Sequence, residues 1–348
     1  MTTQINFYCE QNKIPVNLFD KSENLKDLLH EFLQTALEIE LATIPPYLYG
    51  LYTIKKEFAD NDEAVNIIHS VFIQEMIHLT LVANIMNSVG LTPKLTGKSI
   101  ITPYPKALPH TTCKPKIDLQ AFSKRAICGF LEIEKPENPE SIPELTDYKT
   151  IGQFYKALEL LLTLATIKYG TSLFCGDESY QVKNSSTMAV TDLCTSLSAL
   201  KQIADEGEGI AYSIWQTQSH RKLAHYYAFN QINKQQLYNK TDTTETGPTG
   251  ASIEIDYESS YPVATSPIQI RFNEAATKLN DQFNGKYSQL LKTLETAFNG
   301  SPDLIPHAIG QMHELQSAFM YMIQSEIPYN DQTQPNTICG PTFEWVEE

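Results

Sequence analysis

The sequence predicts an all-α protein built as a helical bundle with a loop-rich insertion and an extra C-terminal helical hairpin. Apolar residues recur every three or four positions through several long stretches, as in helices with one buried face. The glycine-rich and serine-containing motifs that α/β enzymes place after strands are absent. Long helices joined by short loops are typical of antiparallel bundles.

The first two helices are the longest that the periodicity predicts. The first covers 23–58 and contains Pro45 and Pro46, which should kink or break it because proline lacks a backbone donor. The second covers 62–89 and should end at Gly90 in a left-handed C-cap. Further bundle helices are expected at 150–169, 190–208 and 220–237.

The chain divides into three predicted parts. Residues 1–238 form the bundle, interrupted by a proline-rich insertion at 91–148 with one short helix expected at 118–128. Residues 239–268 are rich in Thr, Gly, Ser and Pro and read as a linker or long loop. Residues 269–348 form a helical hairpin and tail that pack on the bundle.

Composition narrows the class of protein. The 348 residues carry a formal net charge of -15, which argues against nucleic acids and anionic membranes as partners. The six cysteines include no Cys-x-x-Cys pair, so we expect reduced thiols. We find no signal sequence and no stretch approaching the roughly 20 apolar residues that span a bilayer. A soluble, cytoplasmic protein is expected.

Glu75 and His78 lie one helical turn apart within an apolar stripe. The stripe consists of Val65, Ile68, Phe72, Leu79, Val82 and Met86. A buried carboxylate is costly unless it is paired or bound to a cation. Glu-x-x-His pairs hold iron or manganese in four-helix bundles. The alternative is a Glu and a His paired with other core groups.

A second inward carboxylate comes from the first helix. Periodicity selects Glu40 over Glu38, because Glu40 shares a face with an apolar stripe. That stripe consists of Leu29, Leu33, Ala36 and Ile44. Glu40 is therefore the natural partner of the Glu75 and His78 pair.

Further candidate ligands lie near the end of the bundle. Glu208 lies nearer the buried face of its helix than Glu206, so we prefer it, and a solvated acidic helix end is the alternative. His225 shares a face with Phe229 and Ile232. A lone histidine at such a position is more often a core residue than a metal ligand. His225 is therefore a candidate ligand only in combination with the other candidate residues.

The segments 36–48 and 74–79 resemble the ferritin-like family that includes the iminophenyl-pyruvate dimer synthases of bisindole pigment biosynthesis. The first contains Ala-Thr-Ile-Pro-Pro-Tyr and the second Gln-Glu-Met-Ile-His-Leu. The likeness continues through most of the chain, at 150–155, 207–209, 223–226, 283–298 and 340–344. The characterised synthases are far longer, so this chain resembles only their ferritin-like portion.

The resemblance implies a ferritin-like four-helix bundle that holds iron, as one or two ions, with manganese as an alternative. Its implied metal ligands are Glu40, Glu75, His78, Glu208 and His225. Related sequences commonly have Glu where this chain has Gln153, and an amide is a poorer ligand for a hard cation than a carboxylate. We therefore expect fewer metal ions than the ferritin-like pattern suggests.

The expected function is oxidative coupling of imines made from an aromatic amino acid by a separate flavin oxidase. This makes the chain a non-haem iron enzyme of specialised metabolism acting on a small organic substrate, with assembly as a homo-oligomer left open. One alternative is iron storage or peroxide scavenging of ferritin or rubrerythrin type. Another is a metal-free binding or scaffold bundle.

Overall fold

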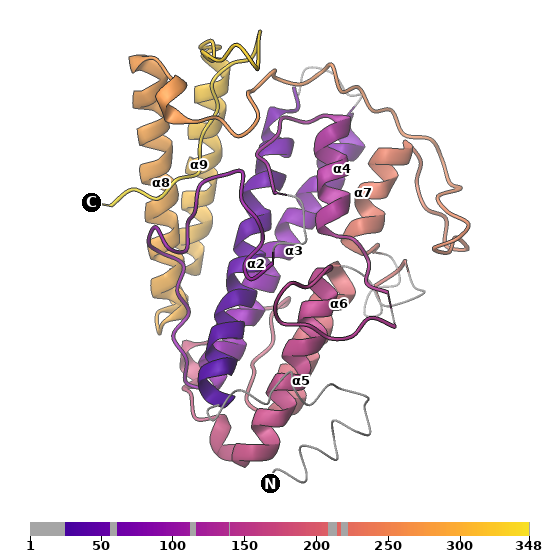
Figure 1. Ribbon diagram of the computed structural model, residues 1–348, viewed down its shortest axis with the longest axis vertical. Helices are drawn as coiled ribbons and strands as arrows, with labels where there is room; N and C mark the ends of the chain where they lie inside the picture. The colour runs from indigo at the N-terminus through magenta and orange to yellow at the C-terminus, as the bar shows by residue number, and fades with distance from the viewer. Residues whose placement is uncertain are drawn as a thin grey trace.

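The computed structural model is all-helical (Figure 1). It describes residues 25–55, 61–111, 116–138, 140–207, 214–216 and 222–347. Within these ranges, backbone pairing outside the helices is limited to isolated bridges. The α-helices of the described residues are α2 (Leu25–Thr53), α3 (Asp62–Ser88), α4 (Lys124–Ile133), α5 (Ile151–Tyr169), α6 (Leu193–Gly207), α7 (His225–Lys234), α8 (Glu274–Phe298) and α9 (Ile305–Gln324).

The bundle is built on the long antiparallel pair α2 and α3. Two shorter pairs cover one side of it: α5 and α6 at one end, and α4 and α7 at the other (Figure 1). The hairpin of α8 and α9 lies on the opposite side, against the same two long helices. The middle of α2 and α3 therefore faces the junction between the two short pairs.

The described helices match most of the predicted ones, with one clear correction in the insertion. The helix expected at 118–128 instead begins at Lys124 and continues to Ile133. Its true start is marked by Ser123, whose side chain accepts a hydrogen bond from the backbone N–H of Ala126. This shift carries the end of α4 to Glu134, inside the core.

The Pro45 and Pro46 pair was expected to kink or break α2, and the structure contradicts the break. The helix continues through both prolines to Thr53. Pro46 has no N–H to offer the carbonyl of Ala42, four residues earlier. The hydroxyl of Tyr104 donates to that carbonyl at 2.9 Å, so the insertion satisfies the acceptor that the proline leaves free.

The prediction for the end of α3 is confirmed. Gly90 has φ of 74°, and the N–H of Leu91 donates back to the carbonyl of Met86 at 2.9 Å.

Contrary to the sequence expectation, α3 is long and apolar enough to cross a membrane by length and composition alone. Over half of its apolar window is buried within the fold, and it carries buried Glu75 and His78, as in the core helix of a bundle.

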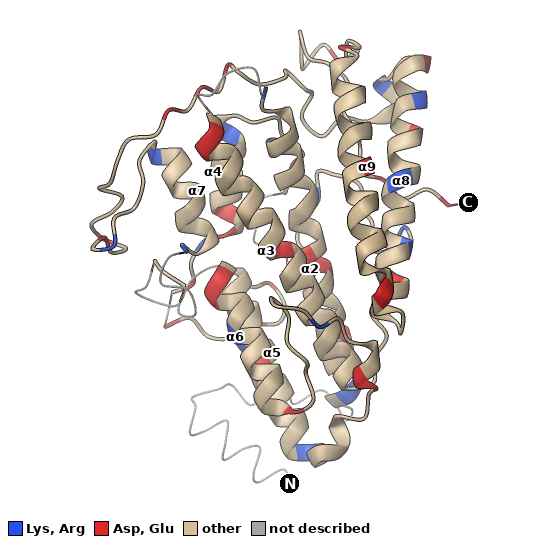
Figure 2. Cartoon of the chain, turned by 180° about the vertical axis from the view of Figure 1, so that it is seen from behind, with Lys and Arg blue, Asp and Glu red and all other residues tan. Residues whose placement is uncertain are grey.

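The charged side chains of the described helices are spread over the surface. In the view of Figure 2, Lys and Arg appear singly along the helices rather than gathered into one area. None of the four cysteines in the described ranges forms a disulfide. Cys9 and Cys113 lie outside the described residues.

The C-terminal hairpin is fixed to the bundle at both ends. Near its turn, where Gly300 has φ of 110°, the side chain of Asn87 donates to the carbonyl of Phe298 at 2.9 Å. At the far end, Tyr49 of α2 packs edge-on against Phe319 of α9, with ring centroids 5.2 Å apart. The C-terminal tail adds Phe343, which packs against Phe283 of α8.

Gly176 provides a test of this packing. A Cβ at this position would lie 1.6 Å from the backbone oxygen of Asn87, so Gly176→Ala must displace the loop from α3. We expect a loss of about 2 kcal/mol or more in the free energy of unfolding, measured by urea denaturation.

The matched control is Gly310→Ala, at an exposed position inside α9 where a Cβ meets nothing within 4 Å. Removing a flexible glycine from a helix should add about 0.5 to 1 kcal/mol. Equal effects of the two substitutions would contradict the packing described at Gly176.

Candidate metal centre

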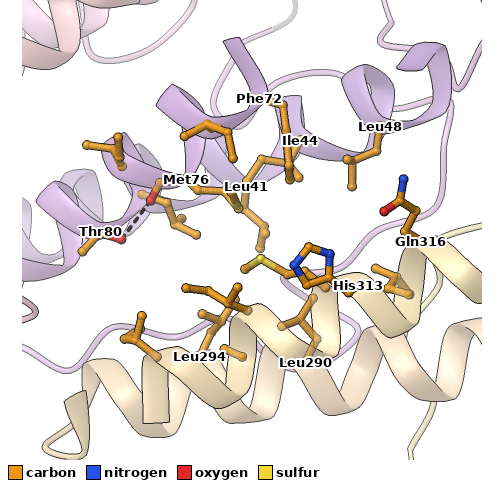
Figure 3. A pocket seen from close by; sticks show the side chains of 18 of the residues that line it. Leu41, Ile44, Leu48, Phe72, Met76, Thr80, Leu290, Leu294, His313 and Gln316 are labelled. Atoms are coloured by element: carbon orange, nitrogen blue, oxygen red, sulfur yellow. Dashed lines mark hydrogen bonds between the residues drawn. The ribbon is translucent and has the colours of Figure 1, made fainter. Parts of the chain in front are cut away.

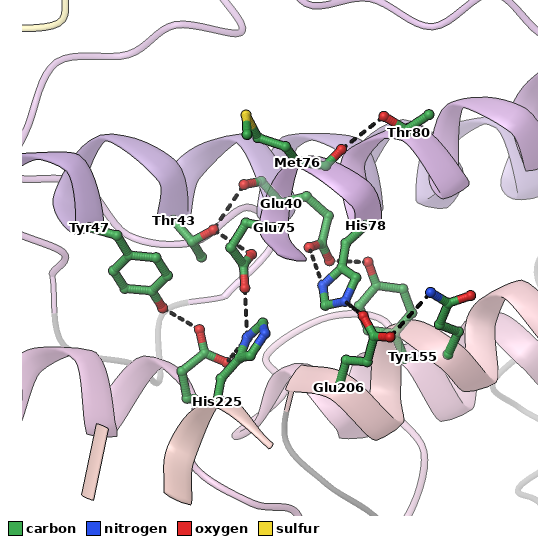
Figure 4. A network of polar contacts seen from close by, with 12 residues as sticks. Glu40, Thr43, Tyr47, Glu75, Met76, His78, Thr80, Tyr155, Glu206 and His225 are labelled. Carbon is green, nitrogen blue, oxygen red and sulfur yellow. Dashed lines mark hydrogen bonds and ion pairs between the residues drawn. The ribbon is translucent and has the colours of Figure 1, made fainter. Parts of the chain in front are cut away.

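Acidic and imidazole side chains converge where the two short helix pairs meet the middle of α2 and α3 (Figure 4). Glu40 comes from α2, and Glu75 and His78 from α3. Three further groups come from helix ends: Glu134 directly after α4, Glu206 in the last turn of α6, and His225 at the first position of α7. Their positions on helix ends bring them to one junction.

Burial distinguishes this cluster from surface charge. Glu40 and Glu75 are each 3% exposed, and His225 is fully buried. Each of these positions follows the apolar periodicity of its helix, so the packing of neighbouring Leu, Ile and Phe side chains forces the polar group inward. Buried charges of this kind require partners.

One half of the cluster is centred on His225. Its Nδ1 lies 2.8 Å from Oε1 of Glu75 and 3.5 Å from Oε2 of Glu134. The hydroxyl of Thr43 donates to the other oxygen of Glu75 at 2.8 Å. Tyr47 donates its hydroxyl hydrogen to Oε1 of Glu134. The imidazole thus faces two carboxylates, each held in place by a hydroxyl.

The other half is centred on His78, which also lies between two carboxylates, but each of these faces a different nitrogen of the ring. Its Nε2 lies 3.1 Å from Oε2 of Glu206, and its Nδ1 lies 3.5 Å from Oε2 of Glu40. Tyr155 of α5 donates its hydroxyl hydrogen to Oε1 of Glu40. Gln202 donates to the second oxygen of Glu206 at 3.2 Å. The cluster therefore consists of two similar half-sites, each with one imidazole and two carboxylates.

The two half-sites are adjacent. The imidazole rings of His78 and His225 are stacked, with centroids 5.4 Å apart and planes inclined by 22°. Glu75, His78 and His225 each offer a ligand atom within 4.8 Å of the others. Groups from both half-sites are therefore close enough to share one metal or to hold two neighbouring ones.

The carboxylates change the protonation of both imidazoles. Burial alone would lower the pKa of His225, but the contacts with Glu134 and Glu75 outweigh it and raise the pKa to about 9. For His78, burial is likewise outweighed by Glu206 and Glu40, and its pKa lies well above the ordinary value. In the absence of a metal, the neighbouring carboxylates therefore favour the protonated form of both rings.

The carboxyl groups respond in opposite directions. Burial, reinforced by the charge of Glu134, raises the pKa of Glu75 to about 7 despite its contact with His225. At Glu206, burial raises the pKa less than the hydrogen bond and charge of His78 lower it, so the net pKa falls. Burial raises the pKa of Tyr47 and of Tyr155 well above the ordinary value of a phenol, so both hydroxyls remain hydrogen-bond donors.

The donor set fits a metal centre. Three of the four carboxylates are buried and that of Glu206 is half-buried, so the ionised cluster keeps an excess of negative charge even with both imidazoles protonated. In addition, Nε2 of fully buried His225 has no hydrogen-bond partner among the described residues. Carboxylates and imidazoles are ligands that suit iron and manganese. Bound cations would neutralise the charge and give the ring nitrogen a partner.

The structure brings together four of the five residues suggested as ligands by the sequence: Glu40, Glu75, His78 and His225. Glu208 lies outside the described residues, whereas Glu206, the alternative at that helix end, contacts His78. Sequence reasoning missed Glu134 and Tyr155. The signal for Glu134 was available, since it follows buried Phe130 by four residues.

The structure contradicts the interpretation of Gln153 as a lost ligand. Its side-chain oxygen accepts from the N–H of Lys149 at 2.8 Å, and its amide donates to the carbonyl of Ile142 at 2.6 Å. Gln153 therefore fastens the preceding loop to the start of α5. The α5 residue that reaches the cluster is Tyr155, and the carboxylates come from elsewhere.

Comparison with known proteins agrees with the helical architecture. The Ferritin-like family model matches residues 33–234, which is more than half of the chain. The solved structure of a ferritin-like protein from Caulobacter vibrioides is similar, with a TM-score of 0.59 and 22% identity, covering 84% of this chain and 93% of the other. A search of curated proteins found no match. On the strength of the family match, this chain belongs to the ferritin-like family.

Proposed function

We propose that this protein is a non-haem iron protein with a dinuclear centre, one ion in each half-site, and that it catalyses oxidation of a small organic substrate. The observation that carries the proposal is the repeated arrangement of one imidazole and two carboxylates around His78 and His225. Four carboxylates and two imidazoles are the ligand set of dinuclear carboxylate centres in helical bundles. Manganese is the alternative metal.

The residues around the ligands have definable roles. A pair of iron ions there would supply the redox equivalents for reaction with dioxygen or peroxide. Thr43, Tyr47 and Tyr155 each hold one carboxylate oxygen, which leaves the other oxygen of that carboxylate to face an imidazole. Such outer partners fix ligand orientation and are as important to a metal site as the ligands themselves.

The space beside the cluster favours a small co-reactant. A cavity of about 20 Å³ adjoins Glu40, Glu75, His78 and Glu134. This is room for one molecule of about the size of water, dioxygen or peroxide. The same observation supports a second candidate function, peroxide scavenging of rubrerythrin type without an organic substrate.

The finer assignment rests on the sequence resemblance. We propose, as the specific activity, oxidative coupling of imines derived from an aromatic amino acid, with a separate flavin oxidase as their source. We also propose a cytoplasmic location. Neither follows from membership of the ferritin-like family, because one fold hosts many activities.

Glu40 and Glu38 give a matched test of metal binding, because they lie two residues apart on different faces of α2. Glu40→Gln should reduce the iron content of reconstituted protein from two ions per chain to one or fewer, since an amide is a poor ligand for a hard cation. Glu38 instead contacts Gln34, and Glu38→Gln should retain both ions. Elemental analysis against protein concentration measures this. Equal iron content in the two variants would contradict the ligand assignment.

Metal affinity should rise with pH, because metal ions and protons compete for the same groups. With the pKa of His225 at about 9 and that of Glu75 at about 7, binding at pH 7 displaces protons. Each displaced proton should lower the apparent Kd about tenfold per pH unit. Titration calorimetry between pH 6 and 8 in buffers of different ionisation enthalpy measures both quantities. A pH-independent Kd would contradict these protonation states.

The same pKa shifts predict the stability of the metal-free protein. The raised pKa of His225 stabilises the fold fully below about pH 6.5, and this contribution is lost as pH rises through about 9. The pKa of Glu75 is also raised. Its contribution to stability is full below about pH 4.5 and is lost as pH rises through about 7. The Tm of metal-free protein should therefore fall from pH 6.5 to 9, while that of iron-loaded protein changes less. Parallel Tm profiles would contradict this.

Activity distinguishes the proposed enzyme from the alternatives. Iron-loaded protein should consume dioxygen or peroxide faster when an aromatic imine substrate is present, and oxidised product should form in proportion. Peroxide turnover that no organic substrate affects would favour the scavenging function. Absence of bound iron, with stability unchanged by Glu75→Ala, would favour a metal-free scaffold and contradict the proposal.

A further inference from the structure

A large apolar cavity lies on the side of α2 and α3 that faces away from the metal centre, between these helices and the C-terminal hairpin (Figure 3). Its volume is about 570 Å³. The walls are mainly leucine, isoleucine and methionine side chains, including Leu41, Ile44, Met76, Leu290, Leu294 and Met312. No Asp, Glu, Lys or Arg lines it among the described residues.

The way the hairpin is attached explains the cavity. The contacts of Asn87 with Phe298 hold one end, and the packing of Tyr49 on Phe319 holds the other. Between these attachments, the facing side chains of α3 are only partly covered: Met76, Ile77 and Thr80 are half-buried. Two helix pairs are thus held apart around an apolar space.

The size of the cavity excludes an ordinary packing defect. Protein interiors are close-packed, with few voids larger than a water molecule. A cavity of about 150 Å³ holds one benzene, so this one accommodates roughly twenty carbon atoms. Its volume also falls within the ~300 to 1,000 Å³ typical of sites for small molecules.

Two phenols of the cavity lining, one half-buried and one buried, supply unused hydrogen-bonding capacity. Tyr52 and Tyr287 both line the cavity, and the hydroxyl of neither has a hydrogen-bond partner among the described residues. Tyr287 is only 5% exposed. Burial raises the pKa of Tyr52 to about 12, so its hydroxyl is a donor at neutral pH. Each hydroxyl can donate one hydrogen bond, which an acceptor on a ligand in the cavity would receive.

The polar groups at the edge are also donors. His313 and Gln316 project from α9 toward α2 and α3 (Figure 3), and exposed His69 of α3 lines the same cavity. Imidazole and amide N–H groups can donate to a carboxylate, which only accepts. Because no Asp or Glu lines the cavity among the described residues, a ligand carboxylate there would meet these donors without an adjacent like charge.

We propose that this cavity binds one long-chain fatty acid. The hydrocarbon chain lies between the two helix pairs, and the carboxyl group accepts hydrogen bonds from the tyrosine, histidine and glutamine side chains that line the cavity. Leu41 and Met76 follow Glu40 and Glu75 directly in sequence, but they line this cavity, whereas the two glutamates line the small space at the metal centre. The fatty-acid site is therefore separate from the metal centre, and its occupancy does not require metal.

Binding of palmitate to delipidated, metal-free full-length protein tests this proposal. Calorimetry should show saturable binding of one palmitate per chain. Met312→Trp fills the cavity and should weaken binding at least tenfold, and Tyr52→Phe should weaken it about fivefold through one lost hydrogen bond. Tyr321→Trp is the matched control, because Tyr321 is 67% exposed on α9 and lies outside the cavity.

The Tm of each variant must first match that of the control within a few degrees. If Met312→Trp does not fold, Tyr52→Phe alone carries the test, and native mass spectrometry counts the palmitate bound. Saturable binding weakened by the cavity variants and not by Tyr321→Trp supports the proposal. Absent binding, equal binding by all variants, or association only with phospholipid vesicles or a second copy of the chain overturns it. None of these outcomes depends on iron.

Discussion

The excess of buried negative charge at the junction of the helices is the constraint on which the site depends. Four carboxylates and two imidazoles lie in an interior where charge is costly, and the protonated imidazoles balance only part of it. Pairing a carboxylate with each histidine lowers this cost, and the hydroxyls of Thr43, Tyr47 and Tyr155 share the remaining lone pairs. The unbalanced negative charge destabilises the metal-free cluster, and the same charge makes the cluster suitable for binding cations.

The fold creates this cluster by interrupting one layer of the bundle. The long helices α2 and α3 are continuous, whereas the opposing layer consists of two short pairs. The break between the pairs exposes helix ends to the core, and Glu134, Glu206 and His225 occupy those ends. On its other side, the continuous pair faces the C-terminal hairpin across the apolar cavity. The two faces of one helix pair thus provide two chemically different environments.

The sequence predicted correctly which side chains are buried where this depends on the periodicity of a single helix. Glu40, Glu75 and His78 were found because helical periodicity decides which side chains of α2 and α3 turn inward. It failed where the insertion acts on another element. Glu134 reaches the cluster from the end of α4, and Tyr104 satisfies the carbonyl that keeps α2 continuous past Pro46. Gln153 was misinterpreted because its side chain bonds the backbone of Lys149 and Ile142, in the segment just before α5. The contacts of Glu134 with His225 and of Tyr104 with α2 join different elements of the fold, so the periodicity of a single helix does not show them.

Anomalous scattering at the iron edge, from crystals of protein reconstituted with iron, tests the central claim most directly. We predict two peaks at this junction, each bound by groups from the cluster of Glu40, Glu75, His78, Glu134, Glu206 and His225. No peak at this junction, or an iron peak bound by other residues, would contradict the assignment of this cluster as a dinuclear metal centre.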